Sequence, residues 1–259
     1  MPVIHPVFFW EETNMPLGVI VNSLSIAVGG IIGAFAGNKL TDDFKEKINM
    51  IFGCCSMAMG ISSIVLMENM PAVVFSVIIG TIIGLCIHLG ELINKAGGLM
   101  QKAVSRFLSG GSGISEEEFN ATLLTVIVLF CASGTGIYGS LAAGMSGDHS
   151  ILFAKSILDL FTALIFACTL GAVVSAIAVP QFIIFFILFS LGGVIIPHTT
   201  PAMINDFKAC GGFLMLATGF RMIKVKMFPT ADMLPAMVLV MPVSLFWASV
   251  VMPAVASLV

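Results

Sequence analysis

Apolar segments long enough to cross a lipid bilayer follow one another along almost the whole chain, and this feature constrains the fold most. The core of a bilayer contains no water, so each backbone N–H and C=O group there must be paired within its own element. A helix meets this need with about 20 apolar residues. The rule yields eight candidate spans, at 16–37, 48–67, 71–89, 119–145, 151–178, 180–196, 203–223 and 233–256. The sixth is short and the seventh opens with polar residues, so seven spans is the alternative count.

The small number of charged residues leads to the same fold class. Charged residues are 10% of the 259 and hydrophobic residues 58%, whereas soluble domains are about a quarter charged. The mean hydropathy is +1.10, so lipid is the expected partner for most of the surface. The six cysteines show no paired CxxC spacing, which argues against disulfides and zinc. We therefore expect an all-α transmembrane bundle in one domain, 1–259, with no enzymatic activity, cofactor, metal ion or nucleic-acid partner.

The positive residues are distributed unevenly between the loops. With eight spans, nine of the eleven Lys and Arg residues lie in odd-numbered loops, and only Lys155 and Lys208 lie on the other side. Because short loops rich in Lys and Arg stay in the cytoplasm, this distribution predicts a multi-pass protein with both termini outside.

Two segments outside the spans have their own character. Residues 1–14 form an N-terminal extension without the features of a cleaved signal peptide, and Met15 is an alternative start of translation. Residues 90–114 combine an apolar helical face with a basic flank and end in a Gly/Ser loop, a pattern typical of a helix that lies in the membrane interface. We expect this helix on the cytoplasmic leaflet, followed by a capping box of Ser115 and Glu118.

The two ends of the chain resemble each other. The pattern Gly29-Gly30 with Asp43-Phe44-Lys45 recurs at the same spacing as Gly192-Gly193 with Asp206-Phe207-Lys208, and further matches pair Gly53 with Gly212 and Gly60 with Gly219. Spans one to three therefore match spans six to eight, in opposite orientations. Such inverted repeats are typical of secondary transporters. The alternatives are a shared composition of Gly-rich membrane helices and a true repeat in a channel or scaffold.

Three stretches of the sequence point to a family. They are MPLGVIVNSLSIAVGGIIGA from Met15, FGCCSMAMGI from Phe52 and FLMLATGFRMI from Phe213. From Met15 onward the chain resembles the YqgA/YdfK-type prokaryotic membrane proteins, a family of unknown function (domain of unknown function 554). The resemblance implies a bacterial or archaeal plasma-membrane protein of a kind sometimes described as a transporter. It implies no substrate, mechanism or catalytic residue.

Asp159 is the one carboxylate well inside an apolar span. Ionisable groups at membrane depth are costly, so they usually face a cavity, a partner or an ion path. We therefore predict that Asp159 binds a coupling cation or shuttles a proton. The alternative is a structural pair with Lys155 one turn away, with the lysine extending outward to the interface.

Other polar groups within the spans are also candidate ligands. Asn22, Ser23 and Ser25 lie on the first span, where they either line a solute site or join helices by hydrogen bonds. Ser133 and Thr135 open a Gly-rich stretch in the fourth span. Its order differs from the Thr-Val-Gly-Tyr-Gly loop of potassium filters, and it lacks a separate pore helix. Local unwinding or a tight helix crossing is the favoured interpretation of this stretch.

The repeat-related acids Asp43 and Asp206 are predicted to lie at helix starts, where a carboxylate complements the helix dipole. Taken together, these patterns predict a transporter or permease for a small solute or ion. A non-transporting scaffold or regulatory protein is the competing class, and a channel is the third. The many small residues suit a homo-oligomer as well as a monomer.

Overall fold

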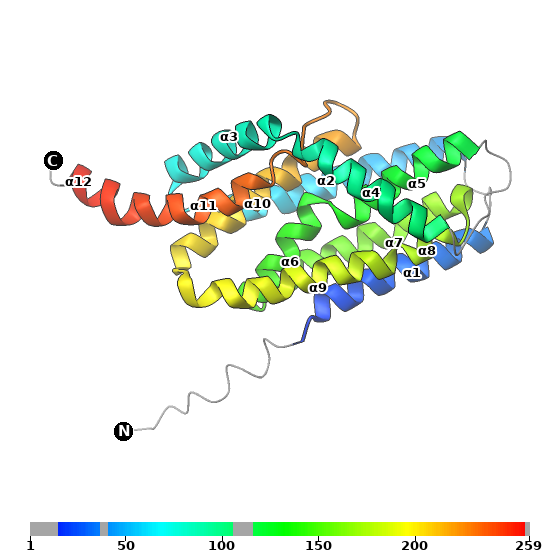
Figure 1. Ribbon diagram of the computed structural model, residues 1–259, viewed down its shortest axis with the longest axis horizontal. Helices are drawn as coiled ribbons and strands as arrows, with labels where there is room; N and C mark the ends of the chain where they lie inside the picture. The colour runs from blue at the N-terminus through cyan, green and yellow to red at the C-terminus, as the bar shows by residue number, and fades with distance from the viewer. Residues whose placement is uncertain (1–14, 37–40, 106–115, 257–259) are drawn as a thin grey trace, which may run out of the picture.

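Helices make up all the regular structure within residues 15–36, 41–105 and 116–256, which the computed structural model describes (Figure 1). The predicted all-α fold is therefore confirmed for these residues. The N-terminal extension at 1–14, the Gly/Ser loop after residue 105 and the capping residue Ser115 lie outside the described parts of the chain.

The helices follow in this order: α1 (Leu17–Ala36), α2 (Asp42–Ile64), α3 (Met70–Cys86), α4 (Leu89–Ser105), α5 (Glu116–Cys131), α6 (Gly134–Ser146), α7 (Ser150–Leu170), α8 (Val173–Ala176), α9 (Ala178–Ile195), η3 (Ile196–His198), α10 (Pro201–Met222), α11 (Pro235–Phe246), η4 (Trp247–Val251) and α12 (Met252–Ala256). Six segments are long and apolar enough to cross a membrane, and a seventh results if α3 and α4, which are bent by 60°, count as one span. The structure thus supports a membrane bundle with about six apolar spans, and the predicted eight remain a proposal.

Glycines allow two pairs of helices to pack at very short distance. α1 runs along α7 (Figure 1). Its Gly29 and Gly33 lie against the backbone carbonyl oxygens of Leu160 and Leu164. A Cβ atom at either glycine would overlap those oxygens. The close approach of these backbones fixes the position of the polar side chains that α1 and α7 direct toward each other.

The second close pair is α2 with α10. A Cβ atom on Gly60 would lie 2.7 Å from the carbonyl oxygen of Gly212, and one on Gly212 would lie 2.6 Å from that of Gly60. Small residues of this kind replace the hydrophobic effect as the basis of helix packing in lipid, because they permit extensive van der Waals contact.

The predicted fourth span is broken into α5 and α6. The chain is not helical at Ala132 and Ser133, and the Ser133 hydroxyl accepts a hydrogen bond from Gly136 N, which caps α6. Thr135 to Gly139 are α-helical, so this stretch does not form the extended backbone of a potassium filter. The local unwinding favoured from the sequence is present, immediately before the glycines.

The fifth predicted span is shorter than expected. α7 ends at Leu170 because Gly171 takes a φ of 77°, which leaves the right-handed helical region. The following residues form the single turn α8, which packs against α1. There the Ser175 hydroxyl donates to the Ala27 carbonyl at 3.0 Å.

Candidate functional site

A chain of side-chain hydrogen bonds joins α1, α7 and α9. Lys155 Nζ donates to both carboxylate oxygens of Asp159, at 2.8 and 2.6 Å, and Asn22 Nδ2 donates to Asp159 Oδ2 at 2.8 Å. Gln181 Nε2 donates to Asn22 Oδ1 at 2.6 Å, and the Ser23 hydroxyl donates to Gln181 Oε1. We call these five side chains the buried polar network.

The network is almost completely removed from the surface. Asn22 and Gln181 are 0% exposed, Lys155 is 4% exposed and Asp159 is 6% exposed. The ion pair considered from the sequence is therefore present, but the expectation that Lys155 extends outward is wrong. Its ammonium group is held by the carboxylate four residues away and lies 6.0 Å from the centre of the Phe130 ring, a cation–π arrangement.

A small polar cavity lies beside the ion pair, at the break between α5 and α6. Its volume is about 40 Å³. Five hydroxyl side chains, three apolar ones, Lys155 and Asp159 line it: Ser56, Leu129, Ser133, Thr135, Lys155, Leu158, Asp159, Thr162, Thr218 and Met222. The cavity thus collects groups from α2, α5, α6, α7 and α10 around one buried ion pair.

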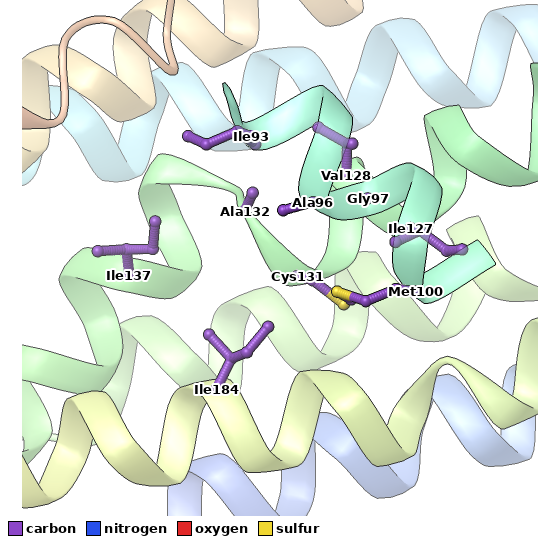
Figure 2. Close-up of a pocket in the computed structure, with 10 residues that line it drawn as sticks. All are labelled: Ile93, Ala96, Gly97, Met100, Ile127, Val128, Cys131, Ala132, Ile137 and Ile184. Atoms are coloured by element: carbon purple, nitrogen blue, oxygen red, sulfur yellow. The ribbon is translucent and has the colours of Figure 1, made fainter. Parts of the chain in front are cut away.

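An apolar pocket of about 230 Å³ lies on another side of the same break (Figure 2). Figure 2 shows α4 passing over this pocket, with Met100 reaching toward Cys131 at the end of α5. Cys131 and Ala132 line the pocket, whereas the next residue, Ser133, lines the polar cavity. The short non-helical connection therefore separates an apolar space from a polar one.

The structure brings most of the predicted ligands together. Asp159, Asn22 and Ser23 belong to the network, and Ser133 and Thr135 line the adjacent cavity. Ser25 lies elsewhere, because its hydroxyl donates back to the Val21 carbonyl of its own helix at 2.8 Å.

Four polar residues of the site were missed from the sequence: Gln181 of the network and Ser56, Thr162 and Thr218 of the cavity. Gln181 follows Pro180 near the start of the sixth predicted span and resembles an interfacial residue there, yet it is fully buried. Thr162 is one turn after Asp159 on the same helix, and this spacing could have identified it.

The repeat-related acids occupy different environments. Asp43 is exposed in the first turn of α2 and pairs with Lys47 at 2.8 Å. Asp206 is not at a helix start, because α10 already begins at Pro201 behind the capping Thr200. That part of the prediction is wrong.

Asp206 nevertheless caps a helix, namely α3 rather than its own. Its Oδ1 accepts the backbone N–H groups of Glu68 and Asn69, at 2.9 Å each, and its Oδ2 accepts the Asn69 amide at 2.9 Å and the Ser244 hydroxyl at 2.6 Å. Four donors and the N-terminal dipole of α3 compensate the burial of this carboxylate.

The connection between α6 and α7 lies outside the spans and contains two titratable groups. Burial lowers the pKa of His149, whose Nδ1 accepts the backbone N–H of Gly18 at 3.4 Å. Burial raises the pKa of Asp148, but hydrogen bonds from Ser150 and the charge of Lys208 outweigh this effect, so the pKa is lowered overall.

Comparison with known proteins adds a family to this geometry. The family described as "Protein of unknown function (DUF554)" matches residues 17–245. The chain is 43% identical to "Uncharacterized protein YqgA" of Escherichia coli (strain K12), over 91% of this chain and 99% of that protein. It is 28% identical to "Uncharacterized membrane protein YdfK" of Bacillus subtilis (strain 168), over 88% of this chain and 95% of that protein. No solved structure matches significantly.

Proposed function

This chain belongs to the DUF554 family of proteins of unknown function. From its own geometry, we propose that it is a membrane transporter or permease for a small solute or ion. The observation that supports this proposal is the buried Lys155–Asp159 pair beside a polar cavity at a broken helix. Broken helices that surround a polar site within the membrane are a common feature of secondary transporters.

Asp159 is the proposed coupling group, and a proton suits it better than a metal cation. Its Oδ2 already accepts hydrogen bonds from Lys155 and Asn22, and its Oδ1 accepts one from Lys155. A metal ion would have to displace these donors, whereas a proton only weakens the ion pair. The thiol of Cys131 in α5 lies close enough to interact with both charges.

The inverted repeat is part of the proposal, and the contact between α2 and α10 supports it. In the sequence match, Gly53 corresponds to Gly212 and Gly60 to Gly219. In the structure, Gly53 lies against Gly219 and Gly60 against Gly212. A two-fold operation that exchanges the copies would turn one of these contacts into the other. Two oppositely oriented copies can form a site that opens to either side in turn.

We further propose eight crossings, of which α10 is the seventh in chain order. α10 has 22 residues, which is sufficient for a bilayer core of about 30 Å at 1.5 Å per residue. Its polar residues do not prevent this, because Asp206 is buried and capped by four donors. Eight crossings place both termini outside the plasma membrane and gather the Lys-rich loops inside.

Flux measurements test the function. Purified protein in liposomes is screened against cations and small metabolites, with a pH-sensitive dye inside the vesicles. Asp159→Asn should abolish solute-dependent proton movement when vesicles with equal amounts of folded protein are compared. The matched control, Asp43→Asn, changes an exposed acid and should transport like the wild type. Full activity of Asp159→Asn would refute the proposed role of this residue.

A further inference from the structure

The cavity beside Lys155 combines apolar side chains with several hydrogen-bond donors. Lys155 has three N–H groups, and two of them donate to the oxygens of Asp159, which leaves one for a further acceptor. α6 begins at this cavity, with its capping residue Ser133 and with Thr135 in the lining. The N-terminus of a helix carries unpaired N–H groups and a partial positive charge, which favour an anion.

Two hydroxyl groups in the cavity provide independent evidence for a ligand. Thr135 and Thr162 both line the cavity and are 6% and 5% exposed. Among the described residues, neither hydroxyl has a hydrogen-bond partner. Ser56 and Thr218, in the same cavity, donate to the carbonyls of Met215 and Leu214. No fully buried side-chain oxygen of the described residues lacks a partner, so these two hydroxyls open onto the cavity. Because hydroxyls inside a protein are normally paired, they indicate a place there for a further acceptor.

We propose that this cavity binds the carboxylate group of a small monovalent anion, held by Lys155, Thr135, Thr162 and the N-terminus of α6. This inference rests on the transport function proposed above and names its substrate class. A water needs roughly 10–15 Å³ of such space, so the cavity of about 40 Å³ accommodates a group of about three heavy atoms, the size of formate. A cation would find few free acceptors there, since Lys155 and Asn22 already occupy the oxygens of Asp159.

The charges agree with this substrate class. With Asp159 ionised, the anion shares one ammonium group with a second carboxylate. When Asp159 takes up a proton, Lys155 is free to pair with the anion alone. Among the described residues around this pair, α1 contributes the Asn22 amide and α5 contributes Cys131, and neither carries a positive charge. Uptake of one proton with one carboxylate would thus leave the buried site neutral.

The test is a binding measurement on the full-length protein in detergent. The melting temperature is followed while sodium formate replaces sodium gluconate, whose chain is too large for the cavity, at constant total sodium. The melting temperature is expected to rise with the formate concentration. A ligand that binds only the folded state stabilises that state, and the effect becomes large once the ligand concentration exceeds Kd.

A double variant provides the decisive comparison. Thr135→Val/Thr162→Val removes two hydroxyls that have no partner, so the melting temperature without formate should not fall. Its Kd for formate should be at least tenfold weaker, since hydrogen bonds to a charged group are among the stronger ones. The control Thr81→Val removes a hydroxyl of α3 that bonds its own helix and should bind formate like the wild type.

The outcomes separate this inference from the proposed function. No saturable response to formate, or an unchanged Kd in the double variant, would overturn the carboxylate site, while solute flux that depends on Asp159 would still support transport. Formate binding without any flux would support the site and count against transport.

Discussion

Separate and combined replacement of Lys155 and Asp159 measures whether this pair only holds α7 in place. Both side chains are more than nine-tenths buried, and their closest N–O distance is 2.6 Å. Lys155→Met leaves a buried carboxylate without its cation, and Asp159→Asn leaves a buried ammonium without its anion. The combined variant contains neither charge and keeps an amide oxygen at position 159 to accept the Asn22 hydrogen bond.

The expected magnitudes follow from the burial of the pair. Each single variant should lower the free energy of unfolding by about 3–5 kcal/mol, the usual cost of one unpaired buried charge. The combined variant should recover most of this loss, because replacing both members of a buried pair is often neutral. The coupling free energy between the two positions, which is the sum of the two single losses minus the combined loss, should therefore be at least about 5 kcal/mol.

Two assays on the same four proteins separate stability from function. Unfolding by sodium dodecyl sulfate in mixed micelles, followed by circular dichroism, gives the free energies. Flux in liposomes gives the activity. We expect the combined variant to be stable and inactive. Normal flux in the combined variant would show that the pair is only structural, and single variants as stable as the wild type would refute the reasoning from burial.

Three further predictions concern the rest of the bundle. Gly60→Ala should destabilise the protein by about 1–3 kcal/mol by overpacking, since its Cβ would lie 2.7 Å from a backbone oxygen of α10. The control Gly98→Ala, whose Cβ would have no atom within 4 Å, should be neutral or slightly stabilising in the same unfolding assay. Asp206→Asn should cost about 1.5–3 kcal/mol for each charge-assisted bond that it loses, whereas the exposed Asp43→Asn should change stability by less than about 0.5 kcal/mol. Burial lowers the pKa of His149, so as the pH falls the unfolded chain is protonated at this residue before the folded protein is. Stability should therefore fall as the pH drops below about 6.5. His149→Asn should reduce the pH dependence of the melting temperature, and an unchanged dependence would contradict this assignment.

The site shows where prediction from sequence ends. Asp159 and Asn22 were identifiable one at a time, because a charged or amide group within an apolar span is costly and needs a reason. Their contact was not, since 137 positions separate them and the register of α1 against α7 depends on the glycines between them. Gln181 was missed for the same reason: nothing in its local sequence indicates that α9 turns it toward Asn22.

The acids Asp43 and Asp206 also show what local sequence cannot predict. The proposed repeat gives them equivalent positions, yet one is exposed beside Lys47 and the other caps α3 from a different helix. Local sequence describes the side chain and its own helix, whereas the cap depends on which helix end is brought near it.

Amino-acid order alone determined that this chain is a helical membrane protein, because apolar length and scarcity of charge decide the solvent before any contact forms. Which polar groups meet, that Lys155 is buried, and that a small cavity with two unpaired threonines lies at the start of α6 were decided only by tertiary structure. The physical reason is that in lipid the apolar surface does not distinguish one helix neighbour from another. Close backbone packing at glycines and the pairing of a few buried polar groups make that choice.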